Sequence, residues 1–299
     1  MRTIKKHLFI QIFIAFIAQN LCGQIKPSTK SLVQFHIIPS TTDSSITSFD
    51  SPHLVVYNPS IKQGKLLIFL TGTGGIPPKK PNDFFLTAIE QGYRVISLSY
   101  FNLPAGVVVC AEEKQFNKDP DCVEKFRIKR IYGENVTSLF PDEPQDAIIN
   151  RITKLLVYLA DHDKQGNWEK YLQNGDIKWN EIALSGQSQG GGMAAFIAKR
   201  SRVARVISFS GGWDYAGGNK IASWYSKDSV TPPKRWYATY HVEEPKAMTI
   251  LESCKAMKIP DNHILALSKE VRQTSKAHGA GISDKIYKPE WIQMLGKGN

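Results

Sequence analysis

Residues 181–200, EIALSGQSQGGGMAAFIAKR, contain the feature that decides the fold. The apolar run at 179–184 predicts a buried strand, and the GGMAAFIAK stretch predicts a helix. Residues 186–190, Gly-Gln-Ser-Gln-Gly, lie between them, so the chain must turn from strand to helix within a residue or two. Such a turn strains the backbone of Ser188, and a glycine on either side avoids collisions. The pattern predicts a serine nucleophile at a sharp strand-to-helix turn.

Two phosphate-binding interpretations of the glycine-rich segments fail on specific residues. A phosphate-binding loop has a lysine and then Ser or Thr after its glycines, but here the glycines run into Met193. The stretch TGTGGIP at 71–77 begins like a dinucleotide-binding fingerprint with Gly72 and Gly74, yet Pro77 stands where the third glycine belongs. An ordinary glycine-rich turn remains the alternative to a nucleophile.

Short apolar segments alternate with helical patterns along the chain. The predicted strands are 53–58, 65–70, 93–100, 181–186, 205–211, 236–241 and 263–268. The predicted helices are NDFFLTAIEQG, PQDAIINRITKLLVYLADH, QGGGMAAFIAKR, PKAMTILESCKAM and the terminal KPEWIQML. Nearly continuous apolar strands that alternate with amphipathic helices are typical of a mostly parallel sheet covered on both faces. The fold class is therefore α/β.

Two connections, about 101–144 and 211–235, are too long for simple loops. Loops of more than about 15 residues in a compact domain are usually lids or binding loops. Both connections follow strand C-termini, where α/β sheets bind their ligands. We expect lid-like insertions here. The alternative is that the aromatic residues of the second connection only pack against the sheet; they are Trp213, Tyr215, Trp224 and Tyr225.

Residues 1–23 have the layout of a secretory signal peptide, in which a basic start, MRTIKK, precedes an apolar run. The run is too short to span a membrane, and no later segment approaches the length of about 18 apolar residues that a span needs. We expect residues 24–299 to form a secreted or periplasmic catalytic domain without a transmembrane segment. A lipid anchor on Cys22 is a minor alternative, because Leu21 is larger than the residue that lipoprotein processing prefers.

The formal net charge is +11, which favours encounters with anionic surfaces. Lysine and arginine are nevertheless scattered among acidic residues, as in KEVRQTSK and VEKFRIKR. Dispersed charge of this kind is typical of a solvated surface, so we expect no nucleic-acid partner.

The cysteines predict one disulfide. Cys110 and Cys122 flank a polar stretch without a regular hydrophobic period, so a bridge between them would close a long loop. Closing such a loop stabilises a domain by about 3 kcal/mol in the chain-entropy model. Cys254 lies in a helical pattern, ILESCKAM, and is expected to be a buried free thiol. Metal binding is not expected, because no Cys or His pair has ligand-like spacing.

From about residue 50 to 299 the sequence resembles the α/β-hydrolase superfamily, in its secreted esterase and lipase branch. The resemblance implies a catalytic triad in the chain order nucleophile, acid, histidine. Among the histidines after Ser188, His241 ends a predicted strand and His263 begins one. His278, in SKAHGAG, lies in a predicted glycine-flanked loop beyond the last strand, where the family holds its base.

The resemblance implies an acid after the strand RWYATYH, where VEEP supplies Glu243 and Glu244. The family more often has Asp there. Glu244 is favoured because it directly precedes Pro245, which is similar to the family's acid-then-proline turn. Asp214, in GGWDY, is a third candidate, since some members carry the acid after the preceding strand.

The resemblance also implies an oxyanion hole made by the backbone N–H groups of Gln189 and Thr73, with Thr71 where His is common. These residues together predict a serine hydrolase that cleaves a carboxylic ester without a cofactor. A peptidase of the same fold is one alternative. A catalytically silent binding protein is another, because a fold does not imply a function.

Overall fold

The computed structural model describes residues 32–298, apart from 63, 111–112, 216–219 and 271–275. Eight strands form one sheet in the order β1-β2-β4-β3-β7-β8-β9-β10. Strand β2 runs antiparallel to β1 and β4, and the pairs from β4 to β10 are parallel. The strand bounds are β1 Val33–Ile37, β2 His53–Tyr57, β3 Leu66–Leu70, β4 Arg94–Leu98, β7 Ile182–Gln187, β8 Arg205–Phe209, β9 Trp236–His241 and β10 Ile264–Leu267. A separate hairpin pairs β5 Leu172–Gln173 with β6 Asp176–Ile177.

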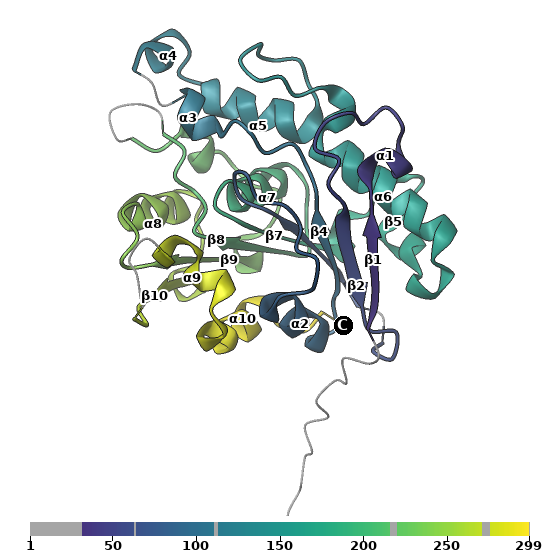
Figure 1. Ribbon diagram of the computed structural model, residues 1–299. Coiled ribbons are helices and arrows are strands. Elements are labelled where there is room, and N and C mark those ends of the chain that lie inside the picture. The colour runs from purple at the N-terminus through teal and green to yellow at the C-terminus, as the bar shows by residue number, and fades with distance from the viewer. Residues whose placement is uncertain (1–31, 63, 111–112, 216–219, 271–275, 299) are drawn as a thin grey trace, which may run out of the picture.

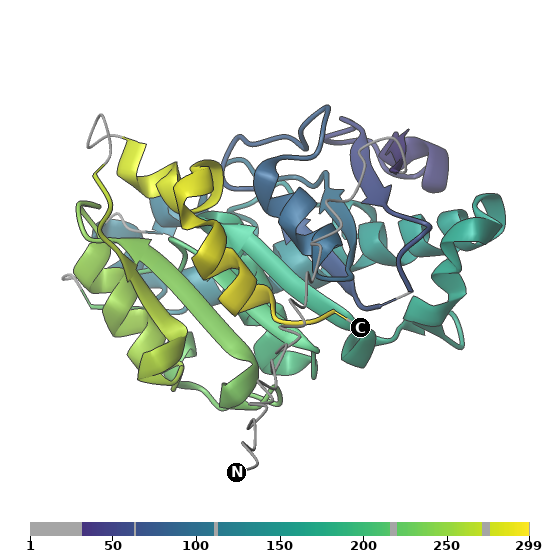
Figure 2. The ribbon, with the colours of Figure 1, turned by 90° about the horizontal axis from the view of Figure 1, so that it is seen from below.

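Helices cover both faces of the sheet. In Figure 1, α5 and α6 lie above the sheet and α2 and α10 below it. Seen from below in Figure 2, α2 in blue and α10 in yellow cross the strands on the same face. The helix bounds are α1 Pro39–Thr42, α2 Asp83–Glu90, α3 Gly106–Cys110, α4 Glu113–Lys118, α5 Cys122–Tyr132, α6 Ile148–His162, α7 Gln189–Arg200, α8 Ala247–Ala256, α9 Ala277–Ser283 and α10 Lys288–Leu295. The predicted α/β class and two-sided covering are confirmed.

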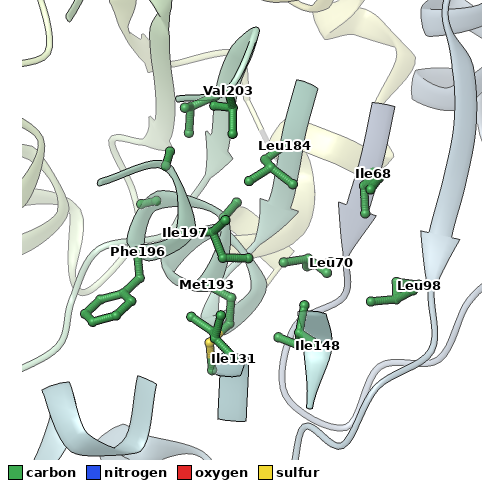
Figure 3. Packing of buried hydrophobic residues seen from close by; sticks show 14 of the residues in the cluster. Ile68, Leu70, Leu98, Ile131, Ile148, Leu184, Met193, Phe196, Ile197 and Val203 are labelled. Atoms are coloured by element: carbon green, nitrogen blue, oxygen red, sulfur yellow. The ribbon is translucent and has the colours of Figure 1, made fainter. Parts of the chain in front are cut away.

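Each face of the sheet packs against its own hydrophobic core, so the strands carry apolar side chains on both faces. The strands β2, β3 and β4 are buried along their whole length, which explains their continuous apolar sequences. In Figure 3, Ile68 and Leu184 of the central strands face Met193 and Ile197 of α7. The second core packs α2, α9 and α10 on the opposite face. These two cores fix the position of the strand ends that carry the site.

The segment 101–144 differs from the predicted lid-like loop. It contains α3, α4 and α5, and α5 packs against α6 and α7 as part of the main core. In the segment 211–235, Trp224 and Tyr225 are buried in the main core, as the packing alternative predicts, and the ring of Trp224 lies 5.2 Å from that of Phe196 in α7. Trp213 is only half-buried and lines a pocket together with Ser188.

The structure contains the predicted disulfide between Cys110 and Cys122, with Cα atoms 5.6 Å apart. The bridge does not close an irregular loop, because Cys110 ends α3 and Cys122 begins α5. It therefore ties two helices together. Cys254 is free and buried in α8, and burial raises the pKa of its thiol to about 12. The predicted signal peptide and Cys22 lie outside the described residues.

Candidate active site

Ser188 occupies the sharp turn between β7 and α7. Its backbone angles, φ 55° and ψ −121°, lie in a region that L-residues rarely adopt. The N–H of Ser188 donates to the carbonyl of Phe209 at 2.8 Å, which holds the turn against β8. A Cβ atom on Gly190 would collide with the backbone of Leu70, and one on Gly186 would collide with Gly190 itself. Close backbone approach is thus the physical reason for the two glycines around the serine.

Glu244 and His278 form a hydrogen bond close to this turn, because the side-chain amide of Gln187 donates to the carbonyl of His278 at 3.2 Å. Nδ1 of His278 lies 2.7 Å from Oε2 of Glu244, although the residues are far apart in sequence. A carboxylate only accepts hydrogen bonds, so Nδ1 carries the proton and Nε2 is left as an acceptor. The other carboxylate oxygen, Oε1, accepts from Oγ of Ser210 and from the N–H of His241, both at 2.7 Å. Glu244 is only 5% exposed, so its orientation is fixed from three sides.

His278 lies in the first turn of α9, and the predicted loop location is therefore wrong. The two glycines in the predicted loop, Gly279 and Gly281, are part of this short helix. A Cβ atom on Gly281 would collide with the side chain of Leu267 in β10. The glycine at 281 thus reflects close packing of α9 on the sheet rather than a flexible connection.

The other two acid candidates point elsewhere. Glu243 is exposed, and its N–H donates to Nδ1 of His241. Asp214 is buried and accepts two hydrogen bonds from Arg127, at 2.9 and 2.8 Å, and one from the indole of Trp224 at 3.0 Å. Its carboxylate is thus committed to Arg127.

Arg127 connects this ion pair to the turn at Ser188. Its Nη1 also donates a hydrogen bond to the carbonyl of Gln189, at 3.0 Å. Burial acts to lower the pKa of the Arg127 guanidinium, but the charge and hydrogen bonds of Asp214 outweigh it, so the pKa lies above the usual value. A Cβ atom on Gly192 would collide with the guanidinium, so the first turn of α7 is shaped to receive it.

A loop at 71–75 lies next to the turn at Ser188, since a Cβ atom on Gly72 would meet Gln187 and Ser188, and it is held by Asn102. The side-chain amide of Asn102 donates to the carbonyls of Gly72 and Gly75, at 3.0 and 2.7 Å, and its Oδ1 accepts from the N–H of Gly74 at 3.2 Å. The hydroxyl of Tyr100 donates to the carbonyl of Thr71 at 2.6 Å. Burial raises the pKa of Tyr100 to about 12, so this donor keeps its proton.

The two residues expected to supply oxyanion donors line one pocket with Ser188. These are Thr73, from the loop at 71–75, and Gln189, the first residue of α7. The N–H of a first helical residue has no carbonyl partner within its helix, so that of Gln189 is suited to bind an anion. The side chain of Gln189 donates to the carbonyl of Asn102 at 3.0 Å, which links the helix to the residue that holds the loop.

Solved structures provide the comparison that bears on the fold. An acylaminoacyl peptidase from Pyrococcus horikoshii matches over 91% of this chain and 42% of its own, with 15% identity and a TM-score of 0.51. A truncated carbohydrate esterase from gut microbiota matches over 91% of this chain and 100% of its own, with 14% identity and a TM-score of 0.49. A bacterial heroin esterase matches over 90% of this chain and 84% of its own, with 14% identity and a TM-score of 0.46. No protein-family model and no curated protein gives a significant match.

The chain has the α/β-hydrolase fold.

Two spaces of different size lie beside Ser188 and His278 in this α/β-hydrolase fold. The pocket on the Ser188 side has a cavity volume of about 20 Å³. The groove on the His278 side has a cavity volume of about 660 Å³. Trp213 stands between them, with its ring 5.5 Å from the imidazole of His278 in an edge-on contact.

Three residues of the site have no signal in the sequence. Asn102 follows β4 in an unremarkable stretch, Ser210 directly follows β8, and Arg127 lies in a helix of mixed charge. Each makes its hydrogen bonds within the site to residues at least 27 positions away in the sequence. Only the positive φ of Ser210, 48°, marks it as unusual, and this is visible in the structure alone.

Within the described ranges, His, Cys, Asp and Glu side chains form no cluster of three or more that could hold a metal ion. A search of the same part of the chain finds no helix with the length and apolar character needed to cross a membrane.

Proposed function

We propose that the protein is an exported serine hydrolase that cleaves carboxylic esters through an acyl-enzyme on Ser188. The observation that carries this proposal is the hydrogen bond of 2.7 Å between Glu244 and His278, next to a serine at a strained strand-to-helix turn. A buried carboxylate that orients an imidazole, with its other nitrogen free to accept a proton, is what activates a serine hydroxyl. The apolar start of the chain supports export.

In this proposal the reaction has two halves. Nε2 of His278 takes the proton of the Ser188 hydroxyl while Oγ attacks the ester carbonyl, and the oxyanion that forms binds the N–H groups of Gln189 and Thr73. The histidine then gives the proton to the leaving alcohol, and the acyl group remains on Oγ. Water attacks the acyl-enzyme in the same way, with His278 as base, and releases the acid. Glu244 stabilises the imidazolium in both halves.

A fluorophosphonate probe tests the nucleophile, because such probes react only with an activated serine. The wild-type protein should be labelled on Ser188 and should hydrolyse p-nitrophenyl acetate. Ser188→Ala should lose both properties, with a loss of activity of several orders of magnitude. The exposed Ser44 provides a control, since Ser44→Ala should behave as wild type. Absence of labelling in a folded wild-type protein would favour a catalytically silent binding protein.

A peptidase is the competing enzymatic function, and one structural neighbour is named an acylaminoacyl peptidase. Hydrolysis of an ester and an anilide that share one acyl group separates the two. An esterase cleaves the ester far faster, whereas a kcat/KM for the anilide equal to that for the ester would favour the peptidase.

A further inference from the structure

The shapes of the two spaces beside the reactive groups indicate which esters the proposed hydrolase accepts. The smaller space, called here the closed pocket, is lined by Ser188, Thr73, Gln189, Gly106, Val107, Phe126, Arg127, Trp213 and Asp214. The larger space, called the open groove, includes His278 and Gly72 among its lining residues. Ser188 lines the closed pocket and His278 lines the open groove, so the bond to be cleaved lies at the boundary between them.

Proton transfer decides which half of the ester occupies each space. The leaving oxygen receives its proton from His278, so the alcohol half must lie on the histidine side. The acyl carbon bonds to Oγ of Ser188, which lines the closed pocket together with the residues expected to bind the carbonyl oxygen, Thr73 and Gln189. Because the alcohol occupies the open groove on the histidine side, the closed pocket is the space left for the acyl substituent.

The walls of the closed pocket cannot move apart to admit a long chain. Val107 is on α3 and Phe126 on α5, and the disulfide of Cys110 and Cys122 ties these two helices together. Helix α3 already packs directly on the Phe126 ring, because a Cβ atom on Gly106 would collide with that ring. On its other side, the ring lies 4.6 Å from that of Phe140.

The floor of the closed pocket is equally fixed. It is formed by the pair of Arg127 and Asp214, which are 2% and 4% exposed and joined by two hydrogen bonds. A long acyl chain would have to displace this pair and leave buried charges without partners, which is strongly unfavourable. Trp213 closes the side toward the histidine.

The open groove has the opposite character. Its apolar lining includes Ile76, Pro78, Phe85 and Ile282, and Ile76 is 61% exposed. A large apolar group would cover this surface and gain about 25 cal/mol for each Å² removed from water. Because His278 lines the groove, the only part of an ester substrate that can reach it is the alcohol half.

We infer that the site is selective for esters of short acyl groups, acetyl above all, with large and mainly apolar alcohols. This inference rests on the proposed function, since it assigns the two halves of an ester from the roles of Ser188 and His278. It follows from the unequal volumes, the tied walls and the ionic floor described above.

Two substrate series test the inference. In the first, p-nitrophenyl esters from acetate to octanoate share one alcohol, and kcat/KM should fall by at least about a hundredfold across the series, since a methylene that a pocket does not fit costs about tenfold or more. In the second, acetates of methanol, butanol and 2-naphthylmethanol share one acyl group, and kcat/KM should rise with the size of the alcohol.

A pair of adjacent valines provides a matched control. Val107 lines the closed pocket, whereas Val108 on the same helix is 67% exposed. Val107→Ala should raise the ratio of kcat/KM for butanoate to that for acetate by about tenfold, and Val108→Ala should leave the ratio unchanged.

The outcomes separate this inference from the function itself. Octanoate cleaved as fast as acetate by a protein whose Ser188 is labelled by a fluorophosphonate overturns the inference and keeps the hydrolase. An equal shift of the ratio in both valine variants also overturns it. If Ser188 is not labelled and no ester is cleaved, the proposed function fails and the inference fails with it.

Discussion

Replacing Glu244 by glutamine tests the acid of the proposed triad. The change preserves size but puts an –NH₂ group in place of one carboxylate oxygen. Oε1 of Glu244 accepts from Ser210 and from the N–H of His241, so the glutamine amide keeps its oxygen on that side. Its –NH₂ group then faces Nδ1 of His278, 2.7 Å away in the wild type.

This orientation fixes the wrong tautomer of the histidine. Nδ1 becomes the acceptor and Nε2 carries the proton, so Nε2 cannot take the proton of the Ser188 hydroxyl. The opposite amide orientation would turn the –NH₂ group toward the backbone donor of His241, and two donors facing each other in a buried site cost about 1–3 kcal/mol. Fixing a triad histidine in the wrong tautomer lowers kcat by about 10⁴-fold. We expect a loss of at least about 10³-fold, which is about 4 kcal/mol of transition-state stabilisation.

Steady-state hydrolysis of p-nitrophenyl acetate measures the effect, and the thermal midpoint shows whether each variant is folded. The adjacent Glu243 is exposed and makes a matched control, so Glu243→Gln should change kcat by less than about tenfold. A folded Glu244→Gln variant that keeps more than about one hundredth of the wild-type kcat would contradict the wrong-tautomer explanation. A larger loss in Glu243→Gln would transfer the role of the acid to that residue.

Three further predictions concern other parts of the site. Asp214→Asn should lower the free energy of unfolding by about 3–5 kcal/mol, because the buried guanidinium of Arg127 loses its charged partner. This corresponds to a fall in Tm on the order of 10 °C. A Tm within about 2 °C of the wild-type value, measured by calorimetry, would contradict this prediction. Asn102→Ala should lower kcat on the order of a hundredfold and leave KM for acetate esters nearly unchanged, since the loop at 71–75 loses its support; unchanged kcat in steady-state kinetics would count against a positioning role. Peptide mass mapping without reduction should find Cys110 joined to Cys122. Burial raises the thiol pKa of Cys254 to about 12, so this thiol is protonated at pH 8 and should react with iodoacetamide only after denaturation. A disulfide that includes Cys254 would contradict this prediction.

The strands of the central sheet could be predicted because burial on both faces leaves a continuous apolar sequence. Strand β1 was missed because the prediction followed continuous apolar runs, whereas this edge strand alternates apolar residues with the exposed Gln34 and His36. Such alternation is itself typical of a half-buried strand. Helix α5 was missed for a different reason. It buries Arg127 and Arg130, whose partners Asp214 and Asp142 lie outside the helix, so its sequence has no clear apolar stripe.

For the site, Ser188 could be proposed from a local turn motif, and Glu244 and His278 from the chain order that the family resemblance implies. The supports of these residues could not. Asn102 and Ser210 act through hydrogen bonds between segments that only the folded chain brings together, and neither residue type is rare enough to be noticed in a sequence. The supporting residues could therefore be identified only in the structure, whereas Ser188, Glu244 and His278 could be proposed from the sequence.

The backbone of Ser188 has a consequence for the history of the protein. Its angles, φ 55° and ψ −121°, suit glycine far better than serine, because glycine has no Cβ atom to clash. Holding serine there costs on the order of 1–3 kcal/mol, a notable part of the 5–15 kcal/mol by which a typical domain is stable. Natural selection for stability alone would replace this serine by glycine. A lineage that lost the proposed activity would be free to make that exchange, so glycine at position 188 in a related sequence would mark the loss of the proposed activity.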